Sequence, residues 1–224
     1  MAYNLGQLRQ AIQNLGYTTD TAAAQNQFIN AVYHEICGMN RWKFLEKQDK
    51  SLTTVAGTDS YTLPFTDWRN LDAVRIEVTA NQQFNNLNYK PEQQFRELQH
   101  IDRDQSTPYF WTYMNNKLMF YPVPDNAYIV TIDYTYEPPD LVADTDVPVI
   151  PQPYQDILVW GAVEYMAMRE RDWLGRQFAQ QKAQTLIQQL RDEYFIKQRQ
   201  TASHVAKSGY WTTNLPYPFI QTGF

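Results

Sequence analysis

The chain has 224 residues, a single cysteine and a formal net charge of -5 at neutral pH. This length suffices for one large domain or two small ones, and the lone Cys37 excludes a disulfide framework or a metal site built from several cysteines. The negative charge argues against general affinity for nucleic acid, which depends on neutralising phosphates. Tyrosine, asparagine and glutamine are abundant and glycine is scarce, a composition that favours a structural or interaction protein.

No export or membrane signal is expected. Residues 1–10 lack the apolar core of a signal peptide. The longest apolar block, residues 157–168, contains Glu164 and is well short of the roughly 20 residues that a membrane span needs. We therefore expect a soluble intracellular product.

Two helices are predicted in the first fifth of the chain. The first carries one apolar stripe at helical spacing and ends at Gly16; its stripe is Leu5, Leu8, Ile12 and Leu15. Asp20 is the predicted N-cap of a second helix that starts at Thr21. Gly38 and Asn40 are expected to break this second helix.

From about residue 48 the apolar residues alternate, as they do in strands. Four short strands are predicted over residues 51–54, 60–63, 71–79 and 84–89. Pro91 is expected to open a short helix that runs through Gln99.

Three further strands are predicted over residues 109–113, 117–121 and 128–136. Asn115 and Asn116 tolerate the positive φ of a tight hairpin turn between the first two. We expect an antiparallel meander with one aromatic face, formed by Tyr128, Val130, Ile132, Tyr134 and Tyr136.

Residues 138–151 are predicted to be a proline-rich linker. The strand end before it and the linker itself concentrate acidic residues, namely Asp133, Glu137, Asp140, Asp144 and Asp146. Such a cluster is typical of a solvated loop, and the alternative is an electrostatic docking surface.

Two long helices are predicted next. The first runs from Pro153 to about Arg171 and is apolar nearly all round, which is typical of a helix in a core or between subunits. Gly175 is expected to form the turn. The second helix, residues 176–199, is amphipathic: Ala179, Ala183, Leu186, Ile187, Leu190 and Tyr194 face inward, and its other face carries many glutamines.

The predicted fold class is α+β, a helical bundle with an inserted antiparallel β-sheet and an extended C-terminal arm. Residues 1–47 and 152–200 are expected to form one helical domain. Residues 48–137 form the inserted β-domain, and residues 201–224 form the arm.

The arm is unusual for a chain terminus because it is rich in aromatic residues and Lys207 is its only fully charged residue. Pro216 and Pro218 forbid a helix across its apolar part. Such a segment must dock on its own domain or on another chain. The candidate partner-binding residues are Tyr210, Trp211, Leu215, Pro216, Tyr217, Pro218, Phe219, Ile220 and Phe224.

No catalytic or metal-binding pattern is complete. His34 and Glu35 begin a zinc-protease motif, but Gly38 stands where its second histidine would be. His34 and Cys37 provide only two ligands, so no metal site and no cofactor are predicted. Glu164 could act with Glu170 or Asp133 as in glycosidases, but it more readily pairs with an arginine across a subunit seam. The chain is predicted not to be an enzyme.

Basic residues on the late helices could line a DNA passage. They are Arg169, Arg171, Arg176, Lys182, Arg191, Lys197, Arg199 and Lys207. They alternate with acidic residues, a pattern more typical of ordinary ion pairs along a helix.

One stretch resembles a known family. Residues 118–125, Leu-Met-Phe-Tyr-Pro-Val-Pro-Asp, are followed by the strand 128–136, by Pro138, Pro139, Pro148 and Pro151, and by the apolar helix. This pattern resembles the head-to-tail adaptor proteins of tailed bacteriophages, also called head completion or connector proteins. The order of helices, β insertion, helices and arm agrees with that family over most of the chain.

The resemblance implies a ring of about twelve subunits at the head–tail junction of the virion, made in the cytoplasm of the bacterial host. The ring docks under the portal protein, passes the genomic DNA without reading its sequence, and offers a platform to tail or nozzle proteins. It implies that the arm binds the portal or a neighbouring subunit. Candidate subunit-interface residues are Trp160, Glu164, Arg171, Gln181 and Gln188. The alternatives are another phage tail or collar protein and, from a different class, a carbohydrate-binding or hydrolytic protein that uses the aromatic sheet.

Overall fold

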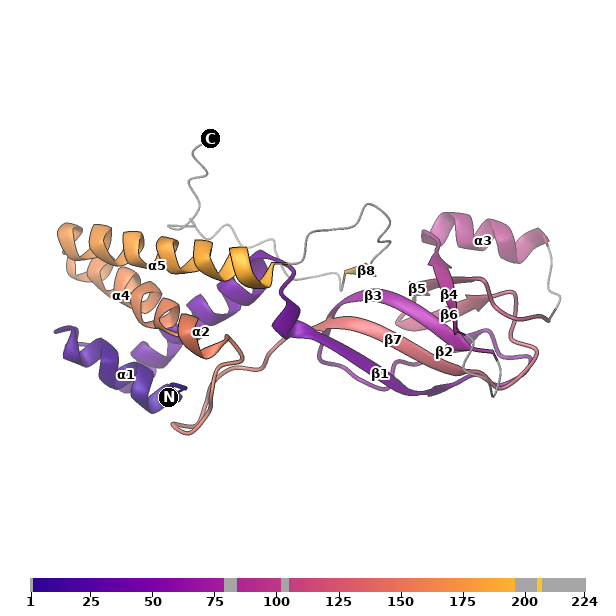
Figure 1. The fold of residues 1–224 in the computed structure, drawn as a ribbon, viewed down its shortest axis with the longest axis horizontal. Helices are drawn as coiled ribbons and strands as arrows, with labels where there is room; N and C mark the ends of the chain where they lie inside the picture. Colours follow the sequence, from indigo (N-terminus) through magenta and orange to yellow (C-terminus); the bar gives the residue numbers. More distant parts are fainter. Residues whose placement is uncertain (1, 79–83, 102–104, 196–204, 207–224) are drawn as a thin grey trace. The chain divides into compact units, whose positions relative to one another are not determined.

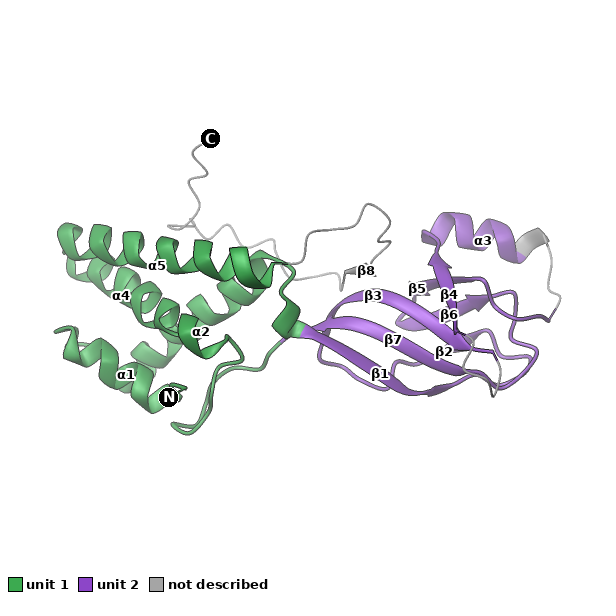
Figure 2. Ribbon diagram, in the orientation of Figure 1, with its two compact units in different colours: residues 1–45, 138–196, 211–224 green, residues 46–137, 197–210 purple. Residues whose placement is uncertain are grey.

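A computed structural model describes residues 2–78, 84–101, 105–195 and 205–206. Within these residues the chain is α+β, with five α-helices and a curled sheet of seven strands that an eighth, two-residue strand joins (Figure 1). The chain divides into two compact units (Figure 2). Among the described residues, the helical unit contains residues 2–45 and 138–195, and the β unit contains residues 46–78, 84–101, 105–137 and 205–206.

The helical unit is built around α4 (Asp156–Glu170), which contacts α1 (Leu5–Asn14), α2 (Ala22–Met39) and α5 (Trp173–Tyr194). This explains why the α4 sequence is apolar nearly all round: neighbours within the same chain bury most of its surface. Short 3-10 turns, η1 (Lys43–Leu45) and η2 (Gln152–Tyr154), also belong to this unit.

The helix ends follow local capping chemistry. Asn4 and Gln7 form a capping box at the start of α1, in which each side chain accepts a hydrogen bond from the other residue's backbone amide. The prediction that Asp20 caps α2 is wrong: the Thr21 hydroxyl caps it, accepting from the Ala24 amide, and the Asp20 carboxylate pairs with Arg169 instead.

The turn between α4 and α5 also differs from the prediction. Gly175 lies inside the first turn of α5, and the break falls at Arg171, whose φ of 62° is left-handed. Asp172 then caps α5 by accepting from the Gly175 amide at 2.9 Å. The helix starts earlier than the position of Gly175 suggests. The stabilisation from an aspartate at the N-cap exceeds the cost of one glycine in the first turn.

Helices α2 and α4 approach closely at Gly161. A Cβ atom added there would lie 2.5 Å from Val32 Cγ1. Only glycine therefore permits this separation of the two helices.

Residues 138–151 are fastened to the helical unit. Leu141 exchanges two hydrogen bonds with the Asn30 side chain, and the amides of Leu5 and Gly6 donate to carbonyls of Asp146 and Asp144. The acids of this segment take part: Arg9 pairs with Asp144 at 2.6 Å, and His34 contacts Asp140 at 2.5 Å. Much of the acidic cluster is thus engaged in holding the segment against α1 and α2.

The β unit holds the strands β1 (Glu46–Thr53), β2 (Ser60–Tyr61), β3 (Trp68–Glu77), β4 (Phe84–Tyr89), β5 (Phe110–Met114), β6 (Lys117–Tyr121) and β7 (Ile129–Tyr136). Their order in the sheet is β1-β7-β3-β4-β5-β6-β2. The helix α3 (Glu92–Ile101) contacts β5 and β6. The hairpin prediction is confirmed: Met114 pairs with Lys117, and Asn115 and Asn116 have φ values of 51° and 60°.

The predicted meander is wrong in its third strand. Strand β7 pairs with β1 and β3 rather than with β6. The sheet is also not purely antiparallel, because β4 and β5 are parallel. Helix α3 lies between these two strands in sequence, and a helical crossover returns the chain in the same direction.

A short strand from the C-terminal segment joins the sheet. Strand β8 (Val205–Ala206) pairs antiparallel with Leu71 and Asn70 of β3. On the same side of the sheet, β4 pairs with β3 only from Val74 to Glu77. Strand β8 therefore occupies a stretch of β3 that β4 leaves free.

Candidate interaction surface

Helix α5 has two contrasting faces. Its inner face is formed by the buried residues Ala179, Ala183, Ile187 and Leu190. Its opposite face carries a row of exposed residues at alternating spacings of four and three, which we call the outer α5 stripe: Leu174, Phe178, Gln181, Thr185 and Gln188. This spacing is that of a helix seam that packs against a partner, and the stripe contains no charged residue. It has the pattern of a contact surface.

The apolar end of the stripe is the most exposed. Leu174 is 80% exposed and Phe178 is 53% exposed. The Phe178 ring meets the half-buried Trp160 of α4 edge-on, with 5.5 Å between ring centroids. Lys182 Nζ lies 5.5 Å from the Phe178 centroid. The two rings and the exposed Leu174 side chain form an apolar surface, which we call the aromatic seat: Trp160, Leu174 and Phe178.

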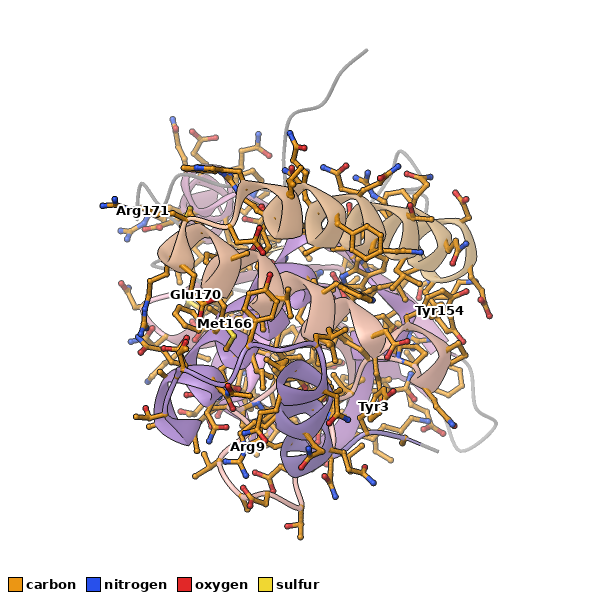
Figure 3. All side chains as sticks on the ribbon, turned by 90° about the vertical axis from the view of Figure 1, so that its left-hand side faces the viewer. Tyr3, Arg9, Tyr154, Met166, Glu170 and Arg171 are labelled. Carbon is orange, nitrogen blue, oxygen red and sulfur yellow. The ribbon has the colours of Figure 1, made fainter. Side chains whose placement is uncertain are left out.

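Of the five predicted interface residues, the structure brings three onto or beside this face. Gln181 and Gln188 belong to the outer α5 stripe, and Trp160 belongs to the aromatic seat. Gln188 also donates to Asp192 at 2.9 Å. Arg171 is exposed at the end of α4, beside Glu170 (Figure 3).

Glu164 lies apart from this surface because it is buried. Its carboxylate is 3.6 Å from Arg176 Nε, and this arginine belongs to the same chain. Burial raises the pKa of Glu164, and the Arg176 charge opposes that rise. Tyr165 donates to the nearby Glu35 at 3.4 Å. Desolvation raises the pKa of Glu35 to about 7, with the hydrogen bond from Tyr165 lowering it and the Glu164 charge adding to the rise.

The predicted partner-binding residues, from Tyr210 to Phe224, all lie outside the described residues. The sequence reasoning missed Leu174 and Phe178. Both residues belong to a spacing of four and three that continues through Gln181, Thr185 and Gln188. This spacing predicts a second helical stripe besides the buried one.

Each candidate catalytic carboxylate has a partner of its own. Asp133 pairs with Arg75 at 2.6 Å, the Glu170 carboxylate accepts a hydrogen bond from Thr19, and Glu164 faces Arg176. The tyrosines of the predicted aromatic face, Tyr128, Tyr134 and Tyr136, are buried, so they offer little surface to a sugar ring.

Cys37 is buried, and no group of three or more histidine, cysteine or acidic side chains gathers within the described part of the chain to hold an ion. Across those same ranges, every helix is too short or too polar to cross a bilayer.

A family comparison agrees with the resemblance noted in the sequence. The model of the SU10 adaptor protein family matches residues 3–209, and the chain belongs to this family. It is a family of phage head-to-tail adaptors, so the class of the protein is that of a structural phage adaptor. No curated protein sequence matches the chain.

Proposed function

We propose that the chain forms a ring at the head–tail junction of the virion, docks under the portal protein, extends the DNA channel and offers a platform for the tail. Membership of a phage adaptor family supports the location and the partners. The non-enzymatic role is consistent with the partners that Asp133, Glu164 and Glu170 already have within their own units. The proposed ring depends on a surface of the chain that can contact a neighbouring subunit.

The outer α5 stripe is the observation that supports assembly into a ring. A monomeric protein gains nothing from exposing Leu174 and Phe178 at 80% and 53%, since burying an apolar side chain is worth roughly 1.5–3 kcal/mol. The glutamines that continue the stripe can be desolvated at lower cost than charged residues. A surface of this kind is suited to contact with a neighbouring subunit, and a contact between two different faces of a chain generates a ring when the rotation closes.

Mass measurement tests this function. The purified chain is measured by light scattering alone and after mixing with purified portal protein. We expect a closed oligomer of defined mass in the presence of portal. A chain that remains monomeric in both samples would remove the adaptor ring from consideration.

A matched pair of variants tests the surface. Phe178→Glu places a charge in the outer α5 stripe, and we expect it to weaken ring formation at least about tenfold. Gln10→Glu adds the same charge at an exposed position of α1 and should leave assembly unchanged. Equal assembly of the two variants would exclude the stripe as a subunit contact.

A further inference from the structure

The helical unit exposes a second apolar surface in the segment that leads into α4. Val142 is 76% exposed and Val147 is 53% exposed. The Asp146 amide donates to the Ala143 carbonyl at 2.9 Å, which closes a turn and brings the two flanking valines toward each other. The exposed residues of this turn and its flanks form what we call the valine surface: Val142, Ala143, Asp144, Thr145 and Val147.

The backbone of the valine surface is fixed by hydrogen bonds. The amides of Val142 and Ala143 both donate to Asp146 Oδ2 at 2.8 Å. Next to them, the Leu141 backbone exchanges two hydrogen bonds with the Asn30 side chain of α2. A backbone that is already ordered has little conformational entropy to lose when it docks on a partner. Valines held exposed on such a backbone are therefore suited to a contact surface.

The valine surface carries negative charge. Residues 138–151 contain three aspartates and no base. The side chains of Asp140 and Asp144 stay 65% and 67% exposed although each has a partner, whereas their partners His34 and Arg9 are only 33% and 16% exposed. The carboxylates thus face the solvent more than the bases that hold them, so an approaching protein meets a negative field.

The outer α5 stripe carries the opposite charge. Residues 173–190 of α5 include Arg176 and Lys182 and no acid. Arg176 is engaged by a buried carboxylate of α4, whereas Lys182 is exposed, with its Nζ 5.5 Å from the Phe178 ring centroid. The preceding acid, Asp172, uses its carboxylate to cap the helix. The aromatic seat therefore combines exposed apolar groups with a cation, and the valine surface combines them with anions.

The two surfaces lie on opposite sides of the helical unit. Helix α4 packs against α1 and α2 as well as against α5. The valine surface is fastened to α1 and α2 through Gly6 and Asn30, whereas the outer α5 stripe faces away from α4. Figure 3 shows α5 along the top of this unit and Arg9, the partner of Asp144, at the bottom. One copy cannot join these two surfaces within its own helical unit, whereas successive copies in a large ring present nearly opposite faces to each other.

We propose that the aromatic seat of one copy packs against the valine surface of the next copy. This proposal rests on the proposed ring and names the second face of its subunit contact. Leu174 and Phe178 cover Val142 and Val147, and Lys182 lies near the exposed aspartates of the neighbour. The apolar groups provide the affinity, and the opposite charges set the orientation of the two copies.

Disulfide trapping between full-length variants tests the contact. Leu174→Cys and Val142→Cys are prepared separately, mixed, assembled with portal protein and oxidised. We expect a covalent dimer in the mixture and at least about tenfold less in either preparation alone. Wild-type chain treated in the same way controls for Cys37, which is buried.

The pattern of trapping distinguishes this contact from its alternatives. The double variant Leu174→Cys/Val142→Cys should give a ladder of covalent oligomers, because each copy then contributes to two contacts. Dimers from Leu174→Cys alone would mean that two seats meet each other, and this result would overturn the proposal. Mass spectrometry identifies the partner of each cysteine, and trapping of Leu174→Cys on the portal protein in place of Val142→Cys would also overturn it.

The charges are tested by substitution at Lys182. Lys182→Glu should weaken assembly at about 0.1 M salt by about tenfold, and Lys182→Gln by less. Raising the salt concentration to about 1 M shortens the Debye length from about 10 Å to about 3 Å, so the three proteins should then assemble almost equally. Thermal unfolding of each variant without portal checks that it is folded. Equal assembly of wild type and Lys182→Glu at low salt would contradict the pairing of opposite charges.

The mass of the assembly separates this contact from the proposed ring. A ring of defined mass without the mixed disulfide removes the valine surface as the second face and leaves the adaptor ring intact. Absence of any oligomer in the presence of portal protein removes the ring itself, and the contact with it.

Discussion

Arg176 of α5 lies 3.6 Å, Nε to Oε1, from Glu164 of α4, whose side chain is 1% exposed. Neither Glu164 oxygen has a hydrogen-bond partner among the described residues, so Arg176 is the cation that offsets its desolvation. A buried pair of this kind is weak evidence of net stabilisation, but removing one member leaves the other uncompensated.

Arg176→Met should therefore lower the free energy of unfolding at pH 8 by about 1–3 kcal/mol, since it leaves an unpaired buried carboxylate. Urea unfolding of the full chain measures the loss. The double variant Glu164→Gln/Arg176→Met should recover part of it, because the amide has no charge to desolvate. Arg191→Met, at an exposed position of the same helix, is the control; equal losses in the two arginine variants would contradict a specific role for the pair.

Glu35→Gln should change the pH dependence of stability. Desolvation raises the pKa of Glu35 from 4.5 to about 7, so the folded state holds this proton more tightly than the unfolded state. The stabilisation from this proton is complete below about pH 4.5 and is lost as the pH rises through about 7. The variant cannot ionise, so we expect it to be more stable than wild type at pH 8, by about 1 kcal/mol after allowance for partial exposure, with the difference vanishing near pH 5.

Thermal unfolding at several pH values from 5 to 8 measures this difference. Tyr165, Glu164 and Arg176 remain in both proteins, so the comparison isolates the Glu35 carboxyl group. Glu97→Gln on the exposed face of α3 controls for the loss of one negative charge. A constant difference between Glu35→Gln and wild type across this range would show that Glu35 is not the titrating group.

Gly161→Ala should destabilise the contact between α2 and α4. The added methyl group would lie 2.5 Å from Val32 Cγ1, and overpacking of this degree costs roughly 1–3 kcal/mol. Val32→Ala removes the clashing methyls, so the double variant should be more stable than the sum of the two single losses, with a coupling of about 1 kcal/mol. Denaturant unfolding of the wild type, the two single variants and the double variant measures this coupling. If the two losses of stability simply add, α2 and α4 can move apart to accommodate the added methyl group.

The β5–β6 hairpin provides a local test. Both turn residues have positive φ, which a β-branched residue adopts at a cost of roughly 1–2 kcal/mol. Asn116→Val should lower stability by about that amount, and Asn116→Gly should be neutral or stabilising. Asn85→Val, at an exposed position of β4 where a β-branched side chain suits a strand, is the matched control. Chemical denaturation measures the free energy of unfolding of the three variants relative to wild type.

Local signals predicted much of this fold. The Leu5-to-Ile12 stripe, the inner face of α5 and the Asn115-Asn116 turn each depend on residues a few positions apart, and the structure agrees with them. The family resemblance was confirmed as well. These features are set by helical and turn geometry and need no knowledge of distant segments.

Pairings between distant segments were not predictable in the same way. Strand β7 has apolar and β-branched residues on both faces, and it pairs with β1 and β3 across more than fifty residues of sequence, a register that periodicity does not encode. The partner of Glu164 was expected in another subunit because the sequence shows a charge in an apolar helix but not which helix lies beside it. The outer α5 stripe was overlooked because the buried stripe of the same helix gave the stronger signal.

The pairing of Glu46 with Thr135 has a consequence for the order of folding during synthesis. Helices α1 and α2 leave the ribosome first, but α4, which buries them, follows only after the whole of residues 46–137. Once β1 and β7 have paired, the two ends of this long excursion are adjacent, and the entropic cost of bringing α4 to α2 falls to that of closing a short loop. Pairing of β1 with β7 therefore favours the later packing of α1 and α2 against α4, and a sheet that pairs slowly would delay that packing.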